Sequence, residues 1–143
     1  MTSALENLAG PTKPLVAEPP DEAEVRGLVR SGKARLADAG NAALSLESRF
    51  DLAYNAAHAL CLAALRQKGY RARHRYIVFQ VLPHTLELGP EVWRVLDQAH
   101  NKRNLSEYEG HVEVEERLVI DTIAACMRVA DALDLLPGPN GPA

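Results

Sequence analysis

The hydrophobic positions between residues 45 and 68 repeat at the spacing of an α-helix, so they would form a stripe along one of its faces. Further Ala and Leu residues lie off this stripe, as is typical of a helix that is buried on most sides. Ser45 can cap its N-terminus, and Gly69 ends it. The segment therefore predicts a long central helix. The stripe consists of Leu46, Phe50, Ala53, Ala57, Leu60 and Ala64, at steps of four and three residues.

Four other segments show a helical pattern, and no segment predicts a convincing strand. A first helix should run from about residue 21 to 39, with Asp21 as its cap and Gly40-Asn41 as its stop. The others are expected at about residues 72–82, 90–108 and 112–135. Val-Glu-Val-Glu at 112–115 alternates like a strand but is too short to pair, so it is assigned to a helix start. The pattern predicts an all-α fold, an up-and-down bundle of four to five helices.

The two ends of the chain lack this periodicity. Residues 1–20 contain four prolines and predict a disordered leader. Residues 137–143 predict a disordered tail for the same reason. The remaining residues, 21–136, form one predicted helical domain, which agrees with a chain of 143 residues.

Composition restricts both the fold class and the kinds of ligand that the chain is expected to bind. Hydrophobic residues make up 47% of the chain and aromatic residues only 5%, which favours helices packed through small side chains over a β-sandwich. The net charge of -3 excludes a generally basic nucleic-acid binder but not a local basic patch. Cys61 and Cys126 lie in apolar helical runs and are expected to be buried free thiols.

The sequence lacks the motifs of secreted, membrane-spanning, metal-binding and phosphate-loop proteins. There is no signal-peptide pattern and no uncharged apolar run of about 18 residues, so no membrane contact is expected and the predicted location is cytoplasmic. The chain has no Cys pair at metal spacing, no phosphate-binding glycine loop and no H-E-x-x-H motif. No metal or cofactor is therefore predicted.

The stretch AHNKRNLSEYEGH, residues 99–111, carries the densest polar chemistry in the chain. The stripe of Val92, Leu96 and Ala99 continues by one helical turn to Arg103, so this arginine should face inward. An inward charge needs a partner or a polar cleft. Asp51 and Glu47, on the central helix, are the candidate partners. His100, Asn104 and Tyr108 lie on rows that neighbour Arg103, and a solvated helix face more often shows Glu and Lys. This stretch is therefore a candidate site.

A second candidate is the basic run RQKGYRARHRY at residues 66–76, which contains no acid. Its arginines Arg71, Arg73 and Arg75 could bind phosphates, and the interleaved tyrosines could stack on bases. The alternative is a solvated loop and helix start.

Two features of these segments resemble the HEPN superfamily of all-α domains. One is the alanine-rich long helix SLESRFDLAYNAAHALCLAALRQKGYRARHR, which closes on Gly and basic residues. The other is the later helix ending KRNLSEYEG, with Arg-Asn followed by Tyr, before a long final helix. The resemblance covers about residues 45–135 and implies a helical bundle that often forms a homodimer.

In many HEPN domains an R-x(4–6)-H motif at the dimer cleft cleaves RNA without metal. Carried over by position, Arg103 matches the Arg and Asn104 the polar residue that often follows it. Tyr108 stands where the nearest His would be, and His111 follows beyond the usual spacing. Tyrosine is a poor base at neutral pH because its reference pKa is near 10. His100, one turn before Arg103, is a geometric substitute.

The residues and the resemblance leave two main readings, and whether the chain is an enzyme stays open between them. The first is an accessory module that binds a nucleotide, RNA or a partner protein, without efficient catalysis. The second is a metal-independent ribonuclease toxin that uses Arg103 with Asn104 and either His111 or His100, paired with a nucleotidyltransferase antitoxin. A helical scaffold unrelated to HEPN domains is a third possibility.

Overall fold

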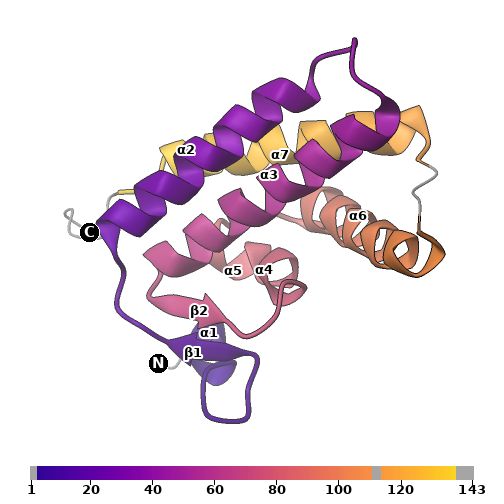
Figure 1. Ribbon diagram of the computed structural model, residues 1–143. Helices are drawn as coiled ribbons and strands as arrows, with labels where there is room; N and C mark the ends of the chain where they lie inside the picture. The colour runs from indigo at the N-terminus through magenta and orange to yellow at the C-terminus, as the bar shows by residue number, and fades with distance from the viewer. Residues whose placement is uncertain (1–2, 111–113, 138–143) are drawn as a thin grey trace.

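The computed structural model describes residues 3–110 and 114–137, and most of them are helical (Figure 1). The all-α prediction is confirmed. No helix in these ranges is long and apolar enough to cross a membrane. The helices are α1 (Ala4–Asn7), α2 (Glu22–Ala39), α3 (Leu46–Gln67), α4 (Ile77–Gln80), α5 (Leu82–Thr85), α6 (Pro90–Glu109) and α7 (Glu116–Asp134). Two short strands, β1 (Leu15–Ala17) and β2 (Tyr70–Ala72), pair antiparallel.

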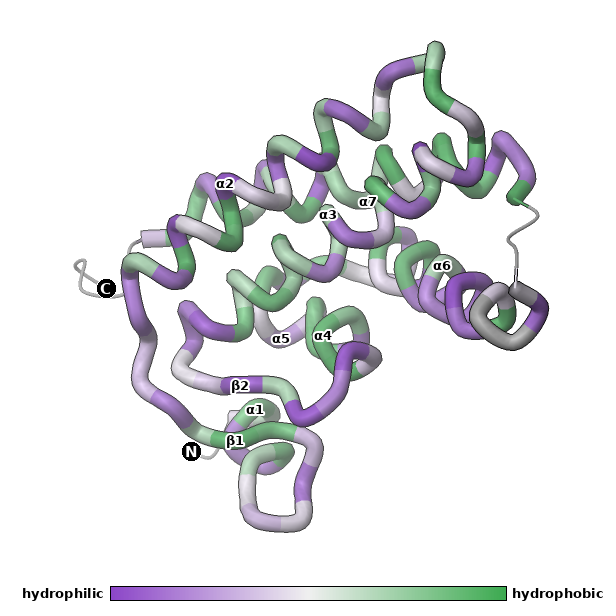
Figure 2. The backbone as a smooth tube through the Cα atoms, viewed as in Figure 1, coloured by the Kyte–Doolittle hydropathy of each residue, from purple (hydrophilic) through white to green (hydrophobic). Residues whose placement is uncertain are grey.

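The predicted central helix is α3, which packs against α2 on one side and α7 on the other (Figure 1). Ser45 caps it as expected, because its hydroxyl accepts the Ser48 amide at 3.1 Å. The chain leaves α3 through Gly69, whose φ of 92° favours glycine. Figure 2 shows hydrophobic segments along much of α3, which supplies the largest share of the core.

Helices α2 and α3 approach each other closely at Gly32. A Cβ atom at this position would lie 2.7 Å from Leu60 Cγ and 3.3 Å from the Ala56 carbonyl oxygen. Leu60 is fully buried, so its side chain has no free space into which to move. The glycine therefore sets the distance between the two helices.

Replacing Gly32 by alanine is expected to lower the free energy of unfolding by about 1–3 kcal/mol through overpacking. Gly27, on the same helix, is the matched control, because a Cβ there meets nothing within 4 Å. Gly27→Ala should raise stability by about 0.5–1 kcal/mol through helix propensity. Urea denaturation measures both changes, and a shift of the same sign in the two variants would contradict the close packing at Gly32.

The leader is where the sequence prediction differs most from the structure. Residues 3–20 were expected to be disordered, but they contain α1 and β1, and both Leu5 and Leu15 are buried. Strand β1 pairs with β2 in the register Leu15 with Ala72 and Ala17 with Tyr70. The proline-rich composition concealed this order because the backbone partner of β1 lies more than fifty residues away in the sequence.

The predicted helix at 72–82 also requires correction. Its first residue, Ala72, is the last residue of strand β2, residues 73–76 form a turn, and only the short α4 and α5 are helical. Ala72 is extended because the backbone groups of Leu15 in β1 are available beside it. Pro83 starts α5 in place of continuing α4, as its missing N–H group favours.

The last two helices follow the predicted pattern. Helix α6 starts at Pro90 and ends at Gly110, whose φ of 78° forms a left-handed cap. Helix α7 begins at Glu116, and the expected start near residue 112 lies outside the described residues. Cys126, on α7, donates its thiol to the Ala53 carbonyl at 3.4 Å. Burial raises the pKa of the Cys126 thiol to about 12, and Cys61 is likewise a buried free thiol.

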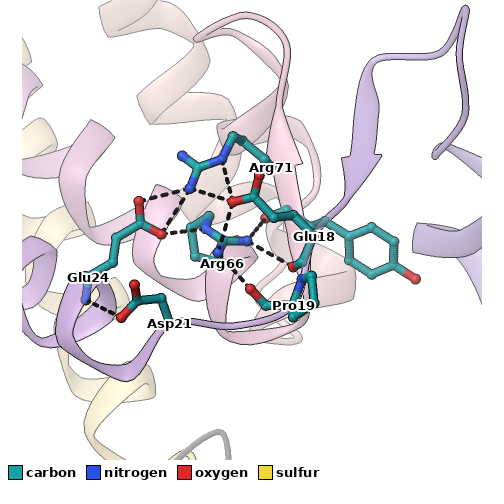
Figure 3. A network of polar contacts seen from close by, with 7 residues as sticks. Glu18, Pro19, Asp21, Glu24, Arg66 and Arg71 are labelled. Atoms are coloured by element: carbon teal, nitrogen blue, oxygen red, sulfur yellow. Dashed lines mark hydrogen bonds and ion pairs between the residues drawn. The ribbon is translucent and has the colours of Figure 1, made fainter.

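Arg66 joins the leader to the bundle (Figure 3). Its side chain is only 1% exposed, although the sequence placed it in a basic run of solvated character. Its Nε donates to Glu24 Oε1 at 2.6 Å, and Nη1 donates to the carbonyl oxygens of Glu18 and Tyr70. Nη2 donates to the Pro19 carbonyl at 2.9 Å and lies 3.2 Å from Glu18 Oε2. A buried guanidinium is tolerated here because each of its nitrogens has an oxygen partner.

The two acids of this network are shared with Arg71. Its Nη2 donates to both oxygens of Glu24, and its Nε donates to Glu18 Oε2 at 2.8 Å. The hydrogen bond from Arg66 lowers the pKa of Glu24, and the bond from Arg71 lowers the pKa of Glu18. We call these four residues, Glu18, Glu24, Arg66 and Arg71, the arginine clamp.

Removing Arg66 should be costly, because it would leave the clamp carboxylates and the leader carbonyls without their buried donor. For Arg66→Met we expect a loss of about 3 kcal/mol in the free energy of unfolding and faster proteolysis of residues 8–20. Arg26→Met is the control, because Arg26 forms an exposed ion pair with Glu22 whose loss should cost under about 1 kcal/mol. Equal losses in both variants would contradict the clamp.

Candidate functional site

Arg103 lies near the end of α6 and faces α3, as its place on the hydrophobic stripe predicted. It forms an ion pair with Asp51, one of the two partners that the sequence suggested. The guanidinium carbon also lies 5.5 Å from the centroid of the Tyr54 ring, within the range of a cation–π contact. The side chain keeps 30% of its exposure, so the charged group can reach a ligand.

His100 lies one turn before Arg103 and is 8% exposed. Its Nδ1 lies 2.9 Å from the Tyr54 hydroxyl, and its Nε2 lies 3.1 Å from the Asn104 side-chain nitrogen. Which ring nitrogen donates and which accepts depends on the tautomer of the histidine. Both ring nitrogens have partners, and the histidine is fixed in place.

These side chains line a half-open cleft of about 480 Å³ between α3, α6 and the turn after β2. Among the described residues that line it there are two arginines and no acid. The cleft is lined by Tyr54, Asn55, Arg75, His100, Arg103 and Asn104.

Arg75 is the side chain of the basic run that reaches this cleft. It is exposed at the turn that follows β2, at residues 73–76. Within residues 3–110 and 114–137 it forms no ion pair and no side-chain hydrogen bond. A guanidinium with five donors at the mouth of a cleft is suited to an anionic group.

The other two arginines proposed for phosphate binding lie elsewhere. Arg71 belongs to the arginine clamp, and Arg73 donates to the carbonyl oxygens of Lys13 and Gly10. Both guanidinium groups fasten the leader, and neither lines the cleft. The sequence showed equivalent arginines at alternate positions, but the pairing of β2 with β1 separates their roles.

The rings of His74 and Tyr76 lie beside the cleft and are not among the residues that line it. The rings of Tyr76 and His100 have centroids 5.3 Å apart, and those of His74 and Tyr76 are 6.4 Å apart. Tyr76 thus connects the basic run to His100 on α6, and its predicted role in stacking on bases stays a prediction. Tyr70, the other tyrosine of the run, instead lies in β2 against the leader.

Two predicted site residues are not placed. His111 lies outside the described residues, and of Tyr108 only the backbone, within α6, is described. The structure adds Tyr54 and Asn55, which the sequence analysis did not select. A polar stripe at Asp51, Tyr54, Asn55 and His58, spaced as one helical face of an alanine-rich helix, was the signal that could have identified them.

The described residues contain no group of three His, Cys, Asp or Glu side chains that could hold a metal ion. Searches against known proteins give no identity: no family model matches the chain, and no curated protein and no solved structure shows significant similarity to it. Any functional conclusion therefore depends on the chemistry of the cleft.

His58 packs behind the site, with its ring edge toward Phe79 at a centroid distance of 6.5 Å. Burial lowers its pKa from 6.5 to about 4, and the positive charge of Arg75 acts in the same direction. The folded protein therefore holds His58 neutral.

This shift makes folding stability depend on pH. Between pH 6.5 and 4 the unfolded chain binds a proton at His58 that the folded protein excludes, so the stabilisation present above pH 6.5 is lost on acidification. The loss at His58 should reach at most about 3 kcal/mol. Between pH 7.5 and 5, the free energy of unfolding measured by urea denaturation should change less in His58→Gln than in the wild type. An identical pH effect in both proteins would contradict the shift.

Proposed function

We propose that the chain is a binding module for a phosphate-bearing ligand, a nucleotide or single-stranded RNA, held in the cleft by Arg75 and Arg103. The observation that carries the proposal is the convergence of two arginines, from the turn after β2 and from α6, on a cleft whose described lining residues include no acid. Asp51, the ion-pair partner of Arg103, lies outside that lining. Arginine forks match the geometry of phosphate oxygens, and two of them can bind one phosphate or two adjacent ones.

The neutral groups of the cleft suit the rest of such a ligand. The amides of Asn55 and Asn104 offer donors and acceptors for a sugar or a base edge. Beside the cleft, Tyr76 and the exposed His74 offer ring surface on which a base extending from the cleft can stack, a contact that tolerates any base. The two arginines, two amides and ring surface together match the parts of a nucleotide.

The geometry favours binding over catalysis. A ribonuclease needs a side chain free to take or give a proton at the 2′-hydroxyl or the leaving oxygen. His100 has both nitrogens engaged by Tyr54 and Asn104, so it would have to break a bond to serve. The HEPN relationship, the homodimer, the toxin activity and the nucleotidyltransferase antitoxin stay predictions of the sequence.

Arg75→Ala tests the site with little risk to the fold, because the side chain is exposed and makes no side-chain hydrogen bond or ion pair with the described residues. Fluorescence anisotropy with a labelled single-stranded RNA, and competition by AMP, should show affinity weakened about tenfold or more. Arg30→Ala, an exposed arginine of α2, is the charge-matched control and should change affinity less than twofold.

The same experiment separates the alternatives. Equal weakening in both variants would indicate non-specific electrostatic binding and would contradict the cleft. Competition by AMP would assign a mononucleotide ligand, whereas RNA binding without AMP competition would assign the polymer. RNA cleavage in EDTA that is lost in Arg103→Ala would instead establish the ribonuclease.

A further inference from the structure

Helix α7 presents an outer face that no described element covers. Ile120 is 50% exposed and Met127 is 55% exposed, and Ala124 lies between them on the same face. Exposed large aliphatic side chains two turns apart on one helix face are characteristic of a docking surface. In Figure 1 this helix lies behind α2 and α3, and its inner side packs on α3 and α6.

Four charged residues surround this apolar centre. Arg117 and Asp131 lie seven residues before and after Ala124, and Asp121 and Arg128 lie three before and four after it. Arg117 lies 3.2 Å from Asp121, and Arg128 lies 3.7 Å from Glu91, and these side chains keep much of their exposure. The set carries two positive and two negative charges in the order plus, minus, plus, minus.

The positions divide into two sides of one face. At 100° per residue, Ile120 and Met127 lie on one side of Ala124, and Asp121 and Arg128 lie on the other. Arg117 and Asp131 lie close to the midline of this face, two helical turns from Ala124 in opposite directions along α7. We call these seven residues, Arg117, Ile120, Asp121, Ala124, Met127, Arg128 and Asp131, the α7 face.

We propose that the α7 face binds a second copy of this chain, with the two α7 helices antiparallel and crossing at Ala124. A two-fold axis at Ala124 sets residue 124 minus n opposite residue 124 plus n of the copy. Arg117 then faces the partner's Asp131, and Asp121 lies beside the partner's Arg128. The same axis keeps the apolar sides together, so Ile120 meets the partner's Met127.

Charge complementarity selects this occupant and this direction. Parallel helices related by a two-fold axis would set Arg117 against Arg117 and Asp131 against Asp131, which is repulsive. A partner of uniform charge would meet repulsion at half of the four charges. The small side chain of Ala124 at the crossing point allows the two helices to approach closely.

The α7 face shares no residue with the cleft of Arg75 and Arg103. A dimer formed through it would therefore carry two separate clefts, one in each copy. This differs from the shared cleft that the HEPN resemblance implies.

Charge exchange tests the pairing. Sedimentation equilibrium at up to high micromolar concentration should give a dimer for the wild type. Arg117→Asp and Asp131→Arg should each weaken dimerisation about tenfold or more by opposing like charges, and the double variant should recover it. Arg26→Asp, which breaks an exposed pair on α2, is the matched control and should leave the dimer intact. A wild-type monomer, or a dimer that the exchanges leave unchanged, would overturn the proposal.

A cross-link tests the crossing point. In Ala124→Cys two thiols would meet at the two-fold axis, so mild oxidation should produce a disulfide-linked dimer within the assembled protein. The native Cys61 and Cys126 are fully buried and should not react. Ala23→Cys, an exposed position on α2, is the control. Equal cross-linking of the two variants would contradict a dimer centred on Ala124.

Discussion

The position of the leader, the two-stranded sheet and the cleft all depend on the burial of one guanidinium group. Arg66 projects from the last turn of α3 into a space closed by the carbonyls of Glu18, Pro19 and Tyr70 and by the carboxylate of Glu24. A buried charge without these oxygens would cost several kcal/mol. The chain therefore has to bring the leader back against α3, and β1 then provides the backbone partner for β2.

The arginine clamp also helps to fix the backbone that carries Arg75, a few residues further along the chain. Beyond β2, the Arg73 amide donates to the Pro14 carbonyl at 3.0 Å, and the Arg73 side chain donates to Lys13 and Gly10. The backbone is thus held as far as the turn that carries Arg75. On the other side of the cleft, α6 is packed on the core through Leu96 and Ala99, so its polar face has a fixed position. A ligand would meet two arginines whose backbone positions are already fixed, which reduces the ordering cost of binding.

Sequence patterns predicted the elements that depend on local chemistry. The caps Asp21 and Ser45, the stops at Gly40 and Gly69, and the inward position of Arg103 all follow from residue spacing along single helices. The leader and β2 could not be predicted in this way, because their order depends on hydrogen bonds across about fifty residues. For the same reason, the sequence could not distinguish Arg75 from Arg71 and Arg73.

The central claim is that, within the basic run at residues 66–76, Arg75 is the arginine available to a ligand, and that it acts with Arg103. Nuclear magnetic resonance of the side-chain Nε–H groups of arginine, during titration with AMP and with short single-stranded RNA, observes each guanidinium directly. The account predicts shifts at Arg75 and Arg103, with Arg66 and Arg71 unchanged in the clamp. Shifts at Arg71 and Arg73, or shifts spread evenly over the exposed arginines, would contradict it.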